Sequence, residues 1–168
     1  MKILGIDPGT QNLGWGFIST DSKRNINKVE FGVLKAPARL NFYERLEFFD
    51  SEIHKICEAY SPDFAVIEKI FLGKNVDSAF KLGHIRGVCA ARCVAAGSQV
   101  QEIAARTVKK AITGSGAADK MVVQNFLFQQ LNIRTDMKSL DASDALALAF
   151  CGLLQDSVKS KNKSLGLI

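Results

Sequence analysis

The sequence predicts an α/β fold in which a five-stranded mixed sheet is flanked by helices. Three strand patterns follow one another with tight connections near the start of the chain, which is typical of an antiparallel meander. Two further strand patterns are each preceded by a helix, and helical crossovers make strands parallel to a neighbour. The chain has 168 residues, of which 47% are hydrophobic and 23% charged, so one domain with a sizeable core is expected.

The first three strands are indicated by apolar and alternating runs. Residues 3–6 are apolar enough for a buried strand, and the Pro-Gly pair that follows Asp7 places this aspartate at the strand's end. Residues 13–19 and 26–34 alternate in the manner of strands, and the polar segment 20–25 separates them.

The rest of the chain alternates helix patterns with short apolar runs. Apolar residues spaced by three or four between positions 40 and 60 predict a long amphipathic helix. The remaining expected elements are a strand at 64–68, a helix at 75–97, a strand at 99–103 and helices at 105–113, 119–131 and 140–155. We expect the polar residues 156–168 to form a flexible C-terminal tail.

Composition narrows the class of protein. We expect a cytoplasmic protein without membrane association, since there are no signal-peptide features and no apolar stretch approaching about 18 residues. The four cysteines include no C-x-x-C pair and the two histidines are far apart, so neither a zinc site nor a disulfide framework is expected.

Positive charge is concentrated in the middle of the chain. The whole chain carries +5, whereas residues 69–120 alone hold nine basic and three acidic side chains, a net +6. Such a segment is typical of a face that binds phosphate groups, although solvated helix surfaces produce similar counts.

Carboxylates recur where apolar elements begin or end. Asp7 closes the first strand, Glu68 closes the strand at 64–68, and Asp141 and Asp144 share one face of a helix's first turn. Each has a structural explanation, because Asp-Pro-Gly is a good turn and acidic residues stabilise helix N-termini. If the first and fourth strands are adjacent and parallel, however, Asp7 and Glu68 emerge side by side.

Four gathered carboxylates would repel one another unless cations lay between them. Oxygen ligands without histidine or thiolate suit Mg²⁺ or Mn²⁺, and two such ions about 4 Å apart are the phosphoryl-transfer arrangement of nucleases. The residues therefore favour a metal-dependent nuclease whose basic segment binds the substrate backbone.

Four stretches, in order, resemble the RuvC family of bacterial Holliday junction resolvases, the crossover junction endodeoxyribonucleases. They are GIDPGT (5–10), IEKIFLGKNVDSAFKLGHIRG (67–87), ARTVKKAITGSGAADK (105–120) and DASDALALA (141–149). The resemblance spans residues 3 to about 150 and implies a single RNase H-like nuclease domain at 1–155.

The resemblance also implies roles for single residues. The catalytic and metal-binding acids would be Asp7, Glu68, Asp141 and Asp144, holding two Mg²⁺ ions per subunit with Mn²⁺ as a substitute. The DNA-binding residues would be Phe71, Lys74, Lys109 and Lys120. Lys69 and His84 stand where uncharged polar residues are expected, so we expect local DNA contacts in this chain to differ from the family pattern.

The implied activity is resolution of four-way junction DNA in recombination and repair, by paired symmetric nicks and metal-dependent hydrolysis. A junction offers two equivalent strands, so a homodimer is expected, with the small-residue helix from Asn75 to Ala96 as a plausible contact. RuvA and RuvB, the branch-migration proteins, are the implied protein partners.

The sequence also allows three other functional interpretations. The turn after Asp7 is similar to phosphate loops of actin-like ATPases and sugar kinases, but these need two such domains around a nucleotide. A catalytically inactive RNase H-like binding module would have lost an acid. An RNase H-like nuclease that processes structured RNA is the nearest alternative, and the lysine and aromatic segments favour the junction resolvase over it.

Overall fold

The computed structural model describes residues 1–69, 75–133 and 139–164, with side chains described as far as Asp156. Its five strands are β1 (Lys2–Asp7), β2 (Asn12–Thr20), β3 (Ile26–Lys35), β4 (Phe64–Glu68) and β5 (Gln99–Ile103). They form one sheet in the order β3-β2-β1-β4-β5. The meander β1 to β3 is antiparallel, and β4 is parallel to both β1 and β5. The predicted five-stranded mixed sheet is confirmed.

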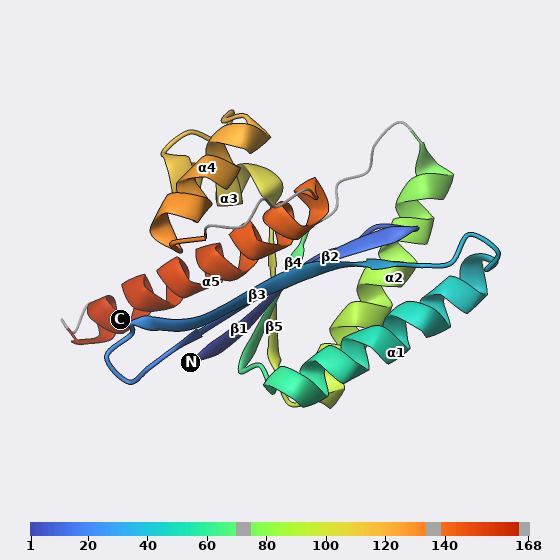
Figure 1. Cartoon of the computed structure of the whole chain (residues 1–168), viewed down its shortest axis with the longest axis horizontal. Coiled ribbons are helices and arrows are strands. Elements are labelled where there is room, and N and C mark those ends of the chain that lie inside the picture. Colours follow the sequence, from blue (N-terminus) through green and yellow to red (C-terminus); the bar gives the residue numbers. More distant parts are fainter. Residues whose placement is uncertain (70–74, 134–138, 165–168) are drawn as a thin grey trace.

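Helices cover both faces of the sheet (Figure 1). The helices α1 (Phe42–Tyr60) and α2 (Val76–Ala95) lie on one side, and α3 (Ala105–Thr113), α4 (Lys120–Gln130) and α5 (Leu140–Ser164) lie on the other. The core has two corresponding parts. Alternate residues of β1 supply both, since Ile3 packs on the α5 side while Leu4 and Ile6 pack on the α1 and α2 side. The central strand is thus buried on both faces.

The long amphipathic helix begins where a capping box begins. The Asn41 side chain accepts hydrogen bonds from the backbone amides of Tyr43 and Glu44, and the Glu44 carboxylate accepts one from the Asn41 amide at 2.6 Å. This reciprocal pairing satisfies amides that the helix itself leaves free, so α1 starts at Phe42.

The last helix is longer than the sequence pattern predicted. We expected it to end at Gln155 and to be followed by a flexible tail, but α5 continues to Ser164. Residues 156–164 contain neither glycine nor proline, so no helix-breaking residue stops the helix there. Arg24, at the turn between β2 and β3, pairs with Asp156 at 3.0 Å and ties this end to the sheet. Residues 165–168 lie outside the described residues, and their flexibility stays a prediction.

Within the described ranges, none of the helices has the length and apolar character needed to cross a bilayer. Cys89 and Cys93 are fully buried in the α1 and α2 part of the core, as expected for small core residues.

Candidate active site

The parallel pairing of β1 with β4 places two acids together. Ile6 of β1 is in register with Ile67 of β4, so the next residue of each strand, Asp7 and Glu68, reaches the same edge of the sheet. This is the adjacency that the sequence argument required. The Asp7 carboxyl is hydrogen-bonded to Glu68. Asp7 and Glu68 therefore lie side by side at this edge, and the role of Asp7 as a site residue stays a prediction.

A pocket of about 150 Å³ opens at this edge. Three acids and two lysines line it from five elements: Asp7 from β1, Glu68 from β4, Asp144 from α5, Lys109 from α3 and Lys120 from α4. Its apolar wall consists of Ala105, Val108, Val123, Ala147 and Leu148. The pocket therefore holds negative and positive side chains beside an apolar wall, at the place where the sheet meets three helices.

Glycines on the sheet bring α5 close enough to deliver its acids. Gly5 and Gly16 are cross-strand partners on β1 and β2. A Cβ on Gly5 would lie 2.0 Å from the backbone oxygen of Ala145, and one on Gly16 would lie 2.5 Å from Cα of Leu146. Side chains at these positions would push the helix away, because such separations are far below van der Waals contact. The close approach seats the turn of α5 that carries Asp144.

Asp141 takes a less central place than the other three acids. It lies in the first turn of α5, one turn before Asp144, and is not among the residues that line the pocket. Its charge nevertheless acts on Asp7. The structure therefore brings three of the four predicted acids to the pocket and keeps the fourth within electrostatic reach.

The gathered acids change the protonation of Asp7. Burial raises its pKa most, and the hydrogen bond to Glu68 and the charges of Glu68, Asp144 and Asp141 raise it further, to about 8. Without a cation nearby, Asp7 therefore carries a proton over much of the neutral range. A positive charge among these carboxylates would offset the repulsion that adds to this shift.

Lys120 supplies one such positive charge. Its ammonium donates a short hydrogen bond to the Asp144 carboxylate, and this ion pair raises the pKa of Lys120. Lys120 is the first residue of α4, where the side chain of Asp119 caps the helix by accepting from the Met121 amide at 2.9 Å. The cap holds the lysine's backbone at the rim of the pocket.

The donor set suits a hard divalent cation, because the pocket offers carboxylate oxygens and neither imidazole nor thiolate. In the described ranges, however, no three Asp, Glu, His or Cys side chains converge closely enough to hold an ion in the observed arrangement. The acids repel one another, and the Lys120 ammonium pairs with Asp144. Without an ion, these carboxylate oxygens therefore do not converge. The residues fit such an ion chemically, and side chains must adjust to hold it.

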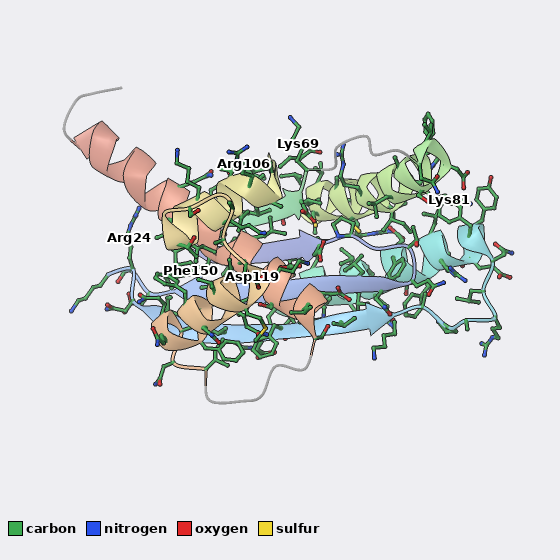
Figure 2. The ribbon with its side chains drawn as sticks, turned by 90° about the horizontal axis from the view of Figure 1, so that it is seen from above. Arg24, Lys69, Lys81, Arg106, Asp119 and Phe150 are labelled. Carbon is green, nitrogen blue, oxygen red and sulfur yellow. The ribbon has the colours of Figure 1, made fainter. Side chains whose placement is uncertain are left out.

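Two predicted DNA-binding residues, Phe71 and Lys74, lie outside the described residues. Lys69, just before them, is exposed, and its backbone amide donates to the Ile103 carbonyl at 2.9 Å. Figure 2 shows Lys69 and Arg106 at the same edge of the molecule, next to the start of α3. Part of the basic segment 69–120 therefore borders the pocket.

His84 lies apart from the pocket, on the exposed surface of α2. Its Nδ1 is 2.8 Å from the Phe80 carbonyl, and its ring meets that of Phe42 edge to face.

Some residues of the site were missed by sequence reasoning. The apolar wall and the glycines under α5 were not assigned to it. The glycines do carry a signal, because a glycine inside a strand often marks the close approach of another backbone, and Gly14 and Gly16 share one face of β2.

Comparison with known proteins identifies the family. The family described as "Crossover junction endodeoxyribonuclease RuvC" matches residues 3–152. Proteins of that name are 44% identical in Bdellovibrio bacteriovorus, over 89% of this chain and 88% of the relative, and 40% identical in Citrifermentans bemidjiense, over 90% and 91%.

Solved structures show the same RNase H-like fold. Thermus thermophilus RuvC has a TM-score of 0.81 at 24% identity, covering 94% of this chain and 96% of that one. The same organism's RuvC in complex with Holliday junction substrate has a TM-score of 0.86 at 23% identity, covering 95% and 96%. With the family match over residues 3–152 and relatives at 40% identity or more, the chain belongs to the RuvC family of crossover junction endodeoxyribonucleases.

Proposed function

We propose that this protein is a structure-selective endonuclease that resolves Holliday junctions in recombination and DNA repair. The observation that carries the proposal is the pocket that joins Asp7, Glu68 and Asp144 to Lys109 and Lys120 in a chain of the RuvC family. Carboxylates that hold divalent ions and lysines that attract phosphate are the two requirements of metal-dependent phosphodiester hydrolysis.

In this proposal Asp7, Glu68, Asp141 and Asp144 bind Mg²⁺, with two ions per subunit and Mn²⁺ as a substitute. The bound ions supply an activated water and stabilisation of the leaving oxygen. Asp7 must be deprotonated to act as a ligand, so ion binding releases its proton and lowers its raised pKa. The apolar wall restricts water around the reacting phosphate.

The lysines act on the phosphate. Lys109 on α3 and Lys120 on α4 line the pocket together with the acids, so a phosphodiester entering the pocket meets positive charge there. We assign Lys120 to the charge that develops in the transition state, where a preorganised ammonium is most effective. Lys109 positions the scissile strand.

Contacts outside the pocket would hold the junction. Phe71 is assigned to stacking on a base and Lys74 to the DNA backbone, from their places in the family motif. Lys69 and Arg106 lie at the same edge of the molecule (Figure 2) and would add to the positive charge that the DNA meets. These contacts supply affinity that depends on salt, because they release counterions from the phosphates.

We further propose a homodimer that pairs through α2. A shallow groove of about 570 Å³ runs along this helix and is lined by Ala79, Phe80, Gly83, His84, Gly87, Val88 and Ala91. A Cβ added at Gly83 or Gly87 would meet nothing within 4 Å in the described chain. A glycine within a helix costs about 1 kcal/mol relative to alanine, so two of them above open space favour a partner that approaches closely. Phe80, 63% exposed, borders the same groove.

The two-fold symmetry of such a dimer matches the two equivalent strands that are cut in a junction. From family membership we place the enzyme in the cytoplasm, working with the branch-migration proteins RuvA and RuvB.

One assay tests the function. The protein and Mg²⁺ are incubated with a four-way junction, a matched duplex and a structured RNA, with Asp144→Asn as the matched inactive control. The expected result is paired, symmetric nicks in the junction alone, absent with EDTA and absent in the variant. Preferential cleavage of the RNA, or cleavage by Asp144→Asn at the wild-type rate, would overturn the proposal.

A further inference from the structure

The Lys120–Asp144 ion pair lies among the residues that the proposed function assigns to metal ions. The Lys120 side chain is 52% exposed and that of Asp144 is 27% exposed, so the pair sits at the mouth of the pocket and not in its depth. The carboxylates of Asp7 and Glu68 also act on the Lys120 ammonium. One ammonium therefore faces three of the four acids.

An ammonium and a divalent ion compete for the same carboxylate oxygens. Mg²⁺ requires nearly ideal octahedral coordination by oxygen at about 2.0 to 2.1 Å, which leaves no room for an ammonium on the same carboxylate oxygen. The two positive charges also repel one another at short distance. In the observed arrangement the Lys120 ammonium occupies Oδ2 of Asp144, so an ion that takes this oxygen must displace the ammonium.

We propose that Lys120 is a built-in counter-ion of Asp144 that a divalent ion displaces, and that this displacement frees the ammonium for the scissile phosphate. The inference rests on the proposed function of the same pocket. It makes Lys120 a positioning residue for metal loading in addition to its assigned role on the phosphate.

The geometry permits the exchange. The Asp119 cap holds the Lys120 backbone at the start of α4, while four flexible side-chain bonds and an exposed position leave the ammonium free to swing. Lys109 lines the same pocket from α3, and the hydrogen-bonded ion pair described for Asp144 is with Lys120. The two lysines thus differ in the one contact that the inference concerns.

Metal affinity without DNA tests the exchange. Mn²⁺ is titrated by electron paramagnetic resonance, and Mg²⁺ by calorimetry, into wild type, Lys120→Met and Lys109→Met. Both variants remove one positive charge from the pocket, so long-range attraction of the ion changes in both. Loss of the competing ion pair, which is partly exposed, should tighten binding by a further factor of about two to five in Lys120→Met alone.

Equal affinities in the two variants, or unchanged affinity in Lys120→Met, would overturn the exchange and leave junction cleavage untouched as a separate result. Absence of metal binding in all three proteins would overturn the exchange together with the metal-dependent function.

A second measurement uses the wild-type protein. In a sample with ¹⁵N-labelled lysine, the Lys120 ammonium resonance is assigned by its loss in Lys120→Met. It should be visible without metal, should weaken in Asp144→Asn, and should shift or broaden when Mg²⁺ is added. A resonance that stays unchanged at saturating Mg²⁺ would show that the ion pair persists and that no exchange takes place.

Discussion

A Cβ atom on Gly14 would lie 2.0 Å from the backbone oxygen of Asp141, so the second residue of α5 rests directly on the backbone of β2. Gly14 is also the cross-strand partner of Asp7. One glycine thus sets the distance between an acid on the sheet and an acid on the helix.

Gly14→Ala should therefore damage the site more than the fold. The added methyl displaces the first turn of α5, and we expect Mg²⁺-dependent cleavage to fall at least about tenfold because small misplacements of catalytic groups are costly. Gly152→Ala is the matched control, since its methyl meets the Val66 side chain two turns beyond Asp144 on α5 and should mainly lower stability, by about 1 to 3 kcal/mol. Cleavage rates and thermal melts of both variants separate the effects. Equal activity losses at equal stability would contradict this assignment.

Asp7→Asn should abolish cleavage and keep junction binding. Asparagine serves a turn as well as aspartate does, but it removes a full negative charge from the proposed metal ligands, so the rate should fall about 100-fold or more. Binding in low Mg²⁺ should equal or exceed that of wild type, because only the deprotonated fraction of Asp7 repels DNA and asparagine has no such fraction. Gel-shift and cleavage assays on the same four-way junction measure both. Cleavage within a few-fold of wild type would reduce Asp7 to a turn residue.

The raised pKa of Asp7 predicts a pH dependence of stability. Its pKa is about 8 in the folded protein and near 3.9 in an unfolded chain, so the folded state holds the proton more tightly. This contribution is fully present below about pH 4 and is lost as pH rises to about 8, which lowers the free energy of unfolding over that window.

Urea unfolding at pH 5 and pH 8 in EDTA measures this effect. Asp7→Asn should lose about 1 to 3 kcal/mol less than wild type between these pH values. Asp77→Asn, which removes an exposed carboxylate on α2, should behave like wild type. Mg²⁺ at pH 8 should restore part of the wild-type loss. An unchanged pH profile in Asp7→Asn would contradict the protonated, crowded carboxyl.

The dimer proposal predicts that filling the α2 groove weakens self-association. Gly83→Leu adds a good helix former where the described chain leaves open space, so the single subunit should fold at least as well as wild type. The dimer should dissociate at least about tenfold more readily because the helices can no longer approach closely. Lys81→Ala, exposed on α2 but outside the groove, is the control. A wild-type monomer by sedimentation, both free and on junction DNA, would exclude the dimer.

Lys120 and Phe71 should affect different steps. Lys120→Ala should slow single-turnover cleavage at saturating enzyme by about 10 to 100-fold, with little change in junction affinity, because the ammonium acts on developing charge. Phe71→Ala should weaken junction engagement instead, since stacking is worth about 1 to 3 kcal/mol per base. Fluorescence anisotropy gives the affinities. Equal losses in rate and affinity for Lys120→Ala would count against its role.

Much of this fold could be predicted from the sequence because the patterns that indicate strands and helices are local. Apolar runs and helical spacing identified each strand and helix, and the order of crossovers made β1 and β4 parallel neighbours. That adjacency was enough to bring Asp7 and Glu68 together. The end of α5 was predicted wrongly because a polar helix that lacks an apolar stripe resembles a tail.

The finer geometry of the site was beyond sequence reasoning for a physical reason. The pairing of Lys120 with Asp144, and the place of Asp141 outside the pocket lining, depend on how closely α4 and α5 pack on the sheet. That spacing is set by contacts between residues far apart in the chain. Gly5 and Gly16 allow the close packing of α5 on the sheet. Their contacts are with Ala145 and Leu146, which come some 130 to 140 positions later in the chain.

Because α5 follows the other described elements in the chain, it also determines when the pocket can form. Asp7 is synthesised well before Asp144, so a growing chain carries an incomplete set of acids until α5 is made. The glycines of β1 and β2 have no helix to pack against until α5 emerges. A chain truncated or stalled before α5 therefore lacks the pocket, which forms only once this helix packs on the sheet.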